Sequence, residues 1–350
     1  MNNVLQSPRA PGSTVKPVNV LAGLESGVIR ATTSISDPGF AWIGTYQMRD
    51  WAVGGHGIVD PVKAIQQSCD TFMYTLGMWL GNWYNNKTPN GTTIAKWQQT
   101  DFVKGMNTLY TWEQKFGLGA ATGIDLPEEV QGRFYVDDSI HRRIVPYDLD
   151  KAVSEVQTRG SYNNSGLLYD LASAAIGQMQ QFTPMELAQY VMTIANGGKR
   201  LQPHVLKAIY KPGETPGLAQ PVQEVKPIVQ DQIKMQAGHL KVVQQGMYAV
   251  CNLPGGTAYG SFHNAPYHAA GKTGTAEYPE DGAMKNISEF IAYAPADHPQ
   301  VAIVVRVPGG GESGETAVPI GRQLLDVYFQ ERHQFFPREQ WKDGETAEHS

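Results

Sequence analysis

The eight residues "APGSTVKP" (10–17) bring glycine, serine, lysine and proline together at the start of a helical pattern. Side chains three apart lie on the same face of a helix, so the spacing predicts that Ser13 and Lys16 can touch. Pro17 has no N–H to donate to the carbonyl of residue 13, and this loss is small only in the first turn of a helix. We therefore expect Ser13 at a helix amino end, where N–H groups are free. A hydroxyl there, beside a neutral amine, would be an activated nucleophile.

The composition is that of an acidic globular chain. It has 350 residues, 41% hydrophobic and 17% charged, enough to bury one large domain or two closely packed subdomains. The formal net charge of -5, without a stripe of Lys and Arg, argues against nucleic acid as a partner. No run of 18 apolar residues and no signal peptide occur, so we expect a soluble piece of a longer protein. The two cysteines, Cys69 and Cys251, are expected as buried thiols or as one disulfide.

Hydrophobic periodicity predicts helices first and a group of strands late in the chain. Helices are expected over residues 12–27, 60–81, 101–115, 183–198, 230–250 and 319–333. Strands are expected over 267–278, 288–296 and 300–308, with 31–59 as loop and short strands and 130–165 mostly as loop. This order predicts an α+β fold: an antiparallel sheet flanked by helices, plus an all-helical subdomain over about 60–250.

Two further motifs carry reactive side chains. "SCDTF" (68–72) places Ser68 and Asp70 on the apolar helix expected over 60–81. "GKTGTAE" (271–277) lies on the first late strand, where Lys272 and Gly274 share one face and the two threonines share the other. The glycine permits close approach of another backbone, and lysine and threonine suit a carboxylate ligand. Taken singly, the first motif could also be an ordinary helix start with a solvated lysine, and the third could be an edge strand with a glycine bulge.

In this order the motifs S-x-x-K, S-x-D and K-T-G resemble those of the penicillin-recognising serine acyltransferases. Their sequences, together with "TGIDLPEE" (122–129), are similar to the transpeptidase domain of class B penicillin-binding proteins, and within that family to the elongation-specific penicillin-binding protein 2 group. The resemblance implies a transpeptidase domain of penicillin-binding protein/β-lactamase-like fold over residues 1–335. Residues 336–350 are expected to form a flexible tail. A membrane anchor and a pedestal region are expected to precede the chain in the parent protein.

The resemblance also implies a role for each of these residues in the reaction. Ser13 would attack the penultimate D-alanine carbonyl of a peptidoglycan stem peptide and form an acyl-enzyme. Lys16 would take the serine proton, Ser68 would pass protons to the leaving group, and Lys272 would keep Lys16 partly neutral through like-charge repulsion. The oxyanion would be bound by backbone N–H groups of the first and third motifs. The substrate would be bound by Asp70, Thr273, Gly274 and Thr275, although the wider family has asparagine in place of the aspartate.

A metal site is also indicated beside the second motif. Asp37, Asp50 and His56 lie in the irregular segment 31–59, and Cys69 lies between the two reactive residues of "SCD". Two carboxylates, an imidazole and a thiolate would complete a four-coordinate structural zinc site, while the chemistry itself would need no cofactor. The spacing matches no standard zinc pattern, so a buried Cys69, a capping Asp37 and a satisfied His56 remain the alternative interpretation.

Three functions fit these motifs. A D,D-transpeptidase inhibited by β-lactams and acting in cell elongation is the first. A β-lactamase or D,D-carboxypeptidase would hydrolyse the acyl-enzyme, and Glu128 and Glu129 are the only glutamates near a suitable loop. A β-lactam sensor would be acylated without turnover. For the transpeptidase, the resemblance implies the periplasmic domain of an inner-membrane-anchored bacterial protein, with a RodA-type SEDS glycosyltransferase and MreC as partners.

Overall fold

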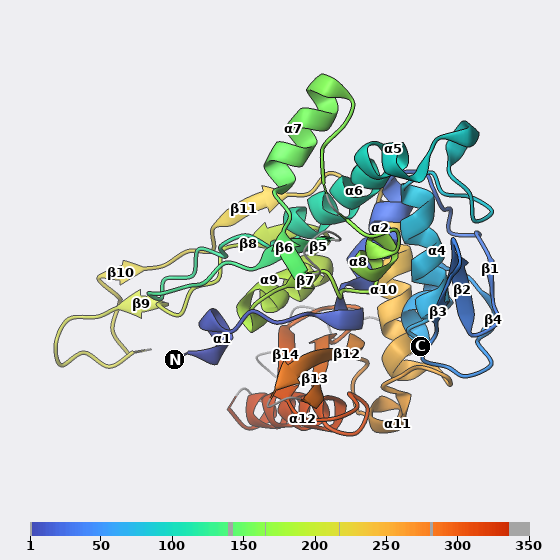
Figure 1. The fold of residues 1–350 in the computed structure, drawn as a ribbon. Helices are drawn as coiled ribbons and strands as arrows, with labels where there is room; N and C mark the ends of the chain where they lie inside the picture. Colours follow the sequence, from blue (N-terminus) through green and yellow to red (C-terminus); the bar gives the residue numbers. More distant parts are fainter. Residues whose placement is uncertain (1, 139–142, 165, 217, 281–282, 336–350) are drawn as a thin grey trace.

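The computed structural model describes residues 2–138, 143–164, 166–216, 218–280 and 283–335, and its centre is a three-stranded antiparallel sheet. The sheet consists, in spatial order, of β12 (Ala270–Glu280), β13 (Ala283–Ala294) and β14 (Val301–Pro308). Figure 1 shows α12 (Ala317–Phe335) below the sheet, α9 (Pro184–Ala195) above it and α10 (Ala237–Asn252) beside β12. The expected α+β fold with a helix-flanked antiparallel sheet is confirmed.

A buried helix, α2 (Lys16–Glu25), organises the helical part of the molecule. Every residue of α2 from Lys16 to Leu24 is buried, as expected for a helix surrounded by others. Helices α4 (Asp70–Leu80), α6 (Asp101–Lys115) and α10 pack directly against it. Helix α8 (Asp170–Ala175) adds a further layer on α4 and α6. The first motif therefore runs from the half-buried Ser13, which lines a pocket, into the core at Lys16.

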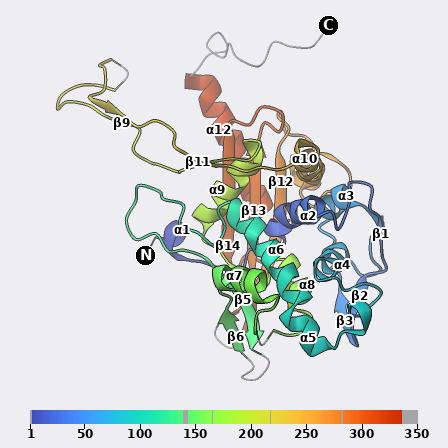
Figure 2. The same ribbon diagram turned by 90° about the horizontal axis from the view of Figure 1, so that it is seen from above.

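Residues 60–250 contain most helices but are not purely helical. The sheet β6–β5–β7 is built from β5 (Arg133–Asp138), β6 (Arg143–Pro146) and β7 (Gln180–Gln181). Together with helix α7 (Leu149–Arg159), it replaces most of the loop expected over 130–165. An arm built from two antiparallel strand pairs, which projects from the body in Figures 1 and 2, was also not expected. It contains β8 (Lys199–Leu201), β9 (Ala208–Ile209), β10 (Gln223–Glu224) and β11 (Val229–Gln232). The division into a helical subdomain stays a prediction.

Several helix predictions agree closely with the structure. The expected helix 101–115 is α6, and the expected helix 183–198 is α9, whose capping box joins Thr183 and Glu186. The expected helix 60–81 is instead two helices, α3 (Pro61–Gln66) and α4. The break arises because Ser68 takes a left-handed conformation with φ of 57° and Cys69 caps α4 by accepting the N–H of Phe72.

The remaining elements are short. The segment 31–59 forms two antiparallel pairs, as expected: β1 (Ile35–Asp37) with β4 (Gly57–Val59), and β2 (Phe40–Ile43) with β3 (Tyr46–Arg49). Short helices complete the described chain: α1 (Asn3–Gln6), η1 (Gly12–Val15), η2 (Pro89–Gly91), α5 (Ile94–Gln99) and α11 (Tyr259–Phe262). Among the described residues, no helix combines the length and apolar character that a membrane crossing requires. The tail predicted over 336–350 lies outside the described residues.

Candidate active site

Ser13 lies on the 3₁₀ turn η1, directly before α2, and Pro17 occupies the first turn of α2 as expected. Gly12 has φ of 50°, and a Cβ on it would come within 2.6 Å of the carbonyl oxygen of Thr275. The Gly12 N–H also donates to the carbonyl of Gly177 at 3.1 Å. Only glycine lets the turn pack this closely, so Gly12 brings Ser13 against strand β12.

The Lys16 side chain is fully buried and turns towards the second motif. Its Nζ donates to the Ser68 carbonyl at 2.6 Å and to the Ser68 hydroxyl at 3.2 Å, and it forms an ion pair with Asp70 at 2.6 Å. Among the described residues, Nζ makes no hydrogen bond to the Ser13 hydroxyl. The hydrogen bonds of Lys16 thus run to the second motif, where a carboxylate is a strong partner for an amine donor, and the Ser13–Lys16 contact stays a prediction.

Lys272 reaches the same hydroxyl from the sheet. Its Nζ donates to Ser68 Oγ at 2.8 Å, and its side chain is completely buried. Burial lowers the pKa of Lys272 well below its usual value, and the nearby charge of Lys16 lowers this pKa further. The family resemblance implies that Lys272 keeps Lys16 partly neutral. In the structure Lys16 is paired with the carboxylate of Asp70, and Lys272 is the amine whose pKa is lowered.

Strand β12 presents its motif as the strand period predicts. Thr273 and Thr275 face the pocket beside Ser13, and the hydroxyls of Thr257 and Thr273 are 2.8 Å apart. Gly274 faces the opposite side, where a Cβ would come within 2.7 Å of the Thr14 methyl group. β12 is an edge strand of its sheet, so one side of its backbone is not paired with another strand. The three motifs thus meet at one pocket of about 400 Å³.

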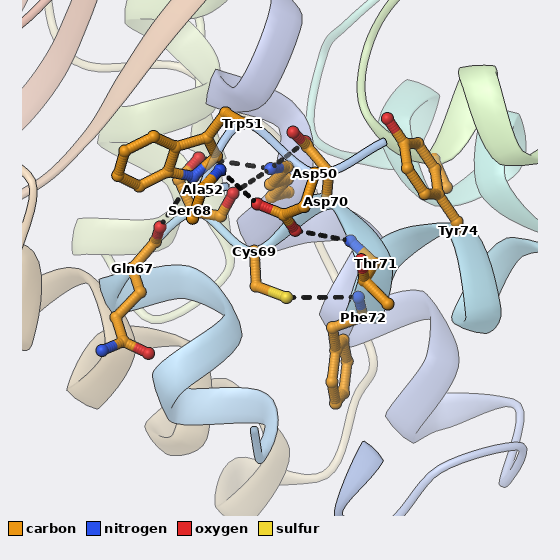
Figure 3. A network of polar contacts seen from close by, with 12 residues as sticks. Asp50, Trp51, Ala52, Gln67, Ser68, Cys69, Asp70, Thr71, Phe72 and Tyr74 are labelled. Carbon is orange, nitrogen blue, oxygen red and sulfur yellow. Dashed lines mark hydrogen bonds and ion pairs between the residues drawn. The ribbon is translucent and has the colours of Figure 1, made fainter. Parts of the chain in front are cut away.

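Several residues that the sequence analysis did not single out also line this pocket, among them Trp51 and Glu312. The Trp51 side chain is 60% exposed, and its Nε1 donates to the Gln67 carbonyl at 3.2 Å (Figure 3). Glu312 lies in the loop between β14 and α12. The available signals were the position of Trp51 next to Asp50 and the glycine-rich "PGGGESGE" around Glu312. Neither signal indicates that Trp51 or Glu312 lies near Ser13 in the folded chain.

The glutamates weighed for a hydrolytic role are engaged elsewhere. Glu128 accepts a hydrogen bond from Gln6 at 2.9 Å. Glu129 accepts from the N–H of Thr122 at 2.8 Å and from that of Gly123 at 3.1 Å. Neither is among the described residues that line the pocket. The structure therefore offers neither of them as the base that would activate a hydrolytic water.

The four residues expected to bind zinc come together beside the second motif. One ligand atom each from Asp37, Asp50, His56 and Cys69 lie within 4.8 Å of one another. Both carboxylates and the thiol are buried. His56 Nδ1 lies 2.7 Å from Asp37 and 3.6 Å from Asp50, and the Cys69 thiol lies 3.4 Å from Asp37. These residues come from the end of β1, the ends of two loops and the cap of α4, so their meeting depends on tertiary structure.

The cysteines do not pair with each other. Cys69 and Cys251 are both free and buried, which excludes the disulfide alternative. Figure 3 shows the Cys69 sulfur directed towards the N–H of Phe72, on the side of the turn away from Ser68. The thiol thus belongs to the acidic cluster and not to the network of lysines around Ser68.

Comparison with known proteins agrees with the order of the motifs. Residues 1–326 match the family model described as "Penicillin binding protein transpeptidase domain". The chain therefore belongs to the penicillin-binding protein transpeptidase family. Within this family it is a class B transpeptidase domain, similar to the penicillin-binding protein 2 and 2B groups.

Individual relatives cover nearly the whole chain. Peptidoglycan D,D-transpeptidase MrdA of Salmonella typhimurium is 31% identical over 94% of this chain and 48% of its own length. The structure of penicillin-binding protein 2B from Streptococcus pneumoniae aligns with a TM-score of 0.73 and 28% identity over 96% of this chain and 49% of that one. The structure of a complex between penicillin-binding protein 2 and MreC from Helicobacter pylori aligns with a TM-score of 0.68 and 26% identity. The alignment covers 95% of this chain and 51% of that one. The chain thus spans about half the length of the relatives it matches.

Proposed function

We propose that this chain carries the D,D-transpeptidase activity of a peptidoglycan synthase that acts in cell elongation and is inhibited by β-lactams. The observation that carries this proposal is the meeting of three motifs at one pocket, with the Ser68 hydroxyl between two buried lysines. The D,D-transpeptidase relatives support the same activity. Peptidoglycan stem peptides and β-lactams are the ligands this function requires, and nucleic acid is not among its partners.

The chemistry proceeds in two balanced steps. In acylation, Ser13 Oγ forms a bond to the penultimate D-alanine carbonyl carbon, and the C–N bond to the terminal D-alanine breaks. The serine proton passes to the leaving nitrogen through Lys16, Ser68 and Lys272, and the lowered pKa of Lys272 favours the neutral amine that can take up a proton. In transfer, an acceptor amine forms a new C–N bond and the C–O bond to Ser13 breaks. The Thr273 and Thr275 hydroxyls bind the substrate carboxylate and Asp70 lines the adjacent wall, while Gly274 lets β12 pack against Thr14 behind the pocket.

Adduct mapping tests this proposal. After exposure to benzylpenicillin, mass spectrometry of peptides should find the penicilloyl group on Ser13, and Ser13→Ala should remain unlabelled. The adduct should persist for hours after washout, since a β-lactamase would release it in seconds. A sensor would form the same adduct but would not transfer an acyl group from a thioester donor to an amine. An adduct on another residue of folded protein, or no adduct, would contradict the assignment.

We also propose that Asp37, Asp50, His56 and Cys69 hold a structural zinc ion. The donor set fits: one thiol, one imidazole and two carboxylates with buried oxygens lie within 4.8 Å of one another, which suits a tetrahedral zinc site. When bound, the ion would cross-link the segment 31–59 to the cap of α4 beside Ser68. It has no part in the acyl transfer steps.

Elemental analysis with two matched cysteine variants tests the zinc site. We expect about one zinc per chain in the wild type and in Cys251→Ser, and much less in Cys69→Ser. Both cysteines are free and buried, so loss of zinc in Cys69→Ser alone cannot be attributed to removing a buried thiol in general. Equal zinc content in all three proteins would contradict the site.

The parent protein is proposed to be anchored in the inner membrane, with this domain in the periplasm. A RodA-type SEDS glycosyltransferase and MreC are its proposed partners, and the MreC proposal is supported by the complex of a similar protein with MreC. Co-purification of the full-length protein with each tagged partner is the direct test. Absence of both partners under conditions that retain the Ser13 adduct would refute the partners and leave the enzymatic proposal intact.

A further inference from the structure

The pocket that contains Ser13 also contains a carboxylate with no role in the steps above. Glu312 reaches the third motif: its Oε2 accepts a hydrogen bond from the Thr275 hydroxyl at 3.3 Å. Its Oε1 accepts from Asn286 Nδ2, on the neighbouring strand β13, at 3.4 Å. The carboxylate therefore lies at the end of the pocket formed by the third motif, in contact with the Thr275 side chain of β12.

The loop that carries Glu312 is tied to the sheet and to α12. The Ser288 hydroxyl donates to the Glu312 carbonyl at 3.4 Å, and the Thr316 hydroxyl donates to the Gly310 carbonyl at 2.6 Å. Gly309 and Gly311 have φ of 71° and 70°, a left-handed conformation that favours glycine. The glycine-rich sequence thus builds a defined turn that directs Glu312 towards the pocket.

The charge of Glu312 is not balanced by a basic side chain. Asp70 and Glu312 are the acidic residues lining the pocket, and Asp70 is paired with Lys16 at 2.6 Å. Glu312 forms no ion pair with a lysine, arginine or histidine in the part of the chain that the structure describes, and its two bonds are to neutral groups. Glu312 is exposed, so a cationic group of a ligand that enters the pocket can reach and pair with this carboxylate.

We propose that Glu312 binds the ammonium group of the acyl acceptor, a primary amine, and so favours transfer to amines over transfer to water. This inference rests on the proposed transpeptidase function and adds the residue that selects the acceptor. The acceptor is an ammonium ion at neutral pH, and it must reach the carbonyl carbon beside Thr275, where Glu312 makes its bond. Binding the cation there places its nitrogen next to the acyl-enzyme.

The transfer step forms one C–N bond, breaks one C–O bond and moves two protons. The bound ammonium releases one proton to water and becomes a neutral amine. The amine lone pair forms the C–N bond, the C–O bond to Ser13 breaks, and the second proton passes from nitrogen to the Ser13 oxygen. Glu312 acts by positioning the nitrogen and leaves the proton route around Ser68 unchanged.

A competition between two acceptors tests this proposal. The chain is acylated with the thioester donor benzoyl-D-alanyl thioglycolate and offered D-alanine, which carries an ammonium group, together with hydroxylamine, which is neutral at pH 7. Both acceptors compete for one acyl-enzyme, so their product ratio does not depend on the rate of acylation. We expect Glu312→Gln to lower the ratio of D-alanine product to hydroxylamine product about fivefold, the effect of one partly exposed ion pair. Glu315→Gln, a control three residues along the same loop, should leave the ratio unchanged.

The possible outcomes separate this inference from the proposed function. A ratio that stays the same in Glu312→Gln, or falls equally in Glu315→Gln, would overturn the role of Glu312 while Ser13 acylation still supported a transpeptidase. If Glu312→Gln instead accelerated acylation and left the ratio unchanged, Glu312 would be a competitor of the donor carboxylate, and the inference would be wrong. Failure of the wild type to form any acyl-enzyme on Ser13 would refute the proposed function itself. Partial recovery of the ratio in Glu312→Asp would support binding of a cation.

Discussion

At the scale of single residues, Ser68 is the common hydrogen-bond partner of the two buried lysines. Its φ of 57° is uncommon for a residue with a side chain, and such conformations cluster at functional sites. In this conformation its hydroxyl accepts hydrogen bonds from both Lys16 and Lys272. The two amines are not equivalent, because Lys16 is paired with Asp70 while burial lowers the pKa of Lys272. One hydroxyl thus connects a lysine held in an ion pair with a lysine whose pKa is lowered.

Trp51 is the residue for which we predict the clearest effect on ligand selectivity. Its exposed indole lines the pocket and is held by the bond from Nε1 to the Gln67 carbonyl. We expect Trp51→Ala to lower the second-order rate constant for acylation by benzylpenicillin about tenfold, because apolar area that the ligand would bury is lost. The effect on 6-aminopenicillanic acid, which lacks the aromatic side chain, should be smaller. Stopped-flow acylation kinetics measure both.

Trp42 provides the control for Trp51. It is 52% exposed on β2 and is not among the described residues that line the pocket. Trp42→Ala should therefore leave both rate constants unchanged. Equal losses in the two variants would mean that tryptophan removal disturbs the segment 31–59 generally, and the pocket role of Trp51 would be rejected.

At the scale of secondary structure elements, the crossing of α3 and α10 depends on one glycine. A Cβ on Gly246 of α10 would come within 2.7 Å of the Ile65 Cβ on α3. Gly238 lies in the first turn of the same helix, and a Cβ on it would meet no atom within 4 Å. The two glycines thus separate the effect of helix propensity from the effect of packing.

We predict opposite effects for alanine at these two positions. Gly246→Ala should destabilise the fold by about 1–3 kcal/mol, because the extra methyl group overpacks the helix crossing. Gly238→Ala should raise the free energy of unfolding by up to about 1 kcal/mol, because alanine has the higher helix propensity. Urea denaturation measures both changes. A stabilising effect of Gly246→Ala would mean that α3 and α10 can move apart without loss of stability. The claim that their crossing depends on Gly246 would then be rejected.

At the scale of the whole molecule, the core contains a carboxyl group that must stay protonated. Glu113 of α6 is completely buried, and its Oε1 accepts a hydrogen bond from Gln180 at 2.8 Å. Burial raises the pKa of Glu113 to about 8, although the bond from Gln180 lowers it in part. Because α6 packs against α2, ionisation of Glu113 would place a charge in the core behind the first motif.

The stability of the fold should therefore fall as pH rises. The pKa of Glu113 in the folded state lies above its unfolded value, so its contribution is complete below about pH 4.5 and is lost as pH approaches about 8. From this group alone we expect a loss of up to about 1.4 kcal/mol per pH unit over this range. Glu113→Gln keeps a hydrogen-bonding group but cannot ionise, so its urea stability should decrease less with pH than that of the wild type.

An exposed glutamate serves as the control for this pH dependence. Glu224 lies exposed on β10, so Glu224→Gln should follow the wild-type curve. Parallel curves for the wild type and Glu113→Gln would show that Glu113 titrates at an ordinary pKa, and the raised value would be rejected.

Much of the fold could be predicted because its signals are local. The helix at 101–115 follows from the 3.6-residue period, and that at 183–198 follows from the Thr183 cap, Pro184 and a glycine stop. The arm over 199–232 gave no such signal, because its strands are only two to four residues long. The break at Ser68 was missed for another reason: the apolar period continues through it, while a left-handed residue is stabilised by its tertiary contacts.

The sequence by itself determined which chemical groups the protein has and the spacing of each motif, because neighbouring side chains and helix periods are set by covalent geometry. Only the tertiary structure decided that Lys16 pairs with Asp70 and Ser68, that Lys272 becomes the amine with the lowered pKa, and that Glu312 shares the pocket of Ser13. Burial and charge pairing are properties of distances across the folded chain. Residues far apart in the sequence acquire them only when the sheet, α2 and the loops pack together.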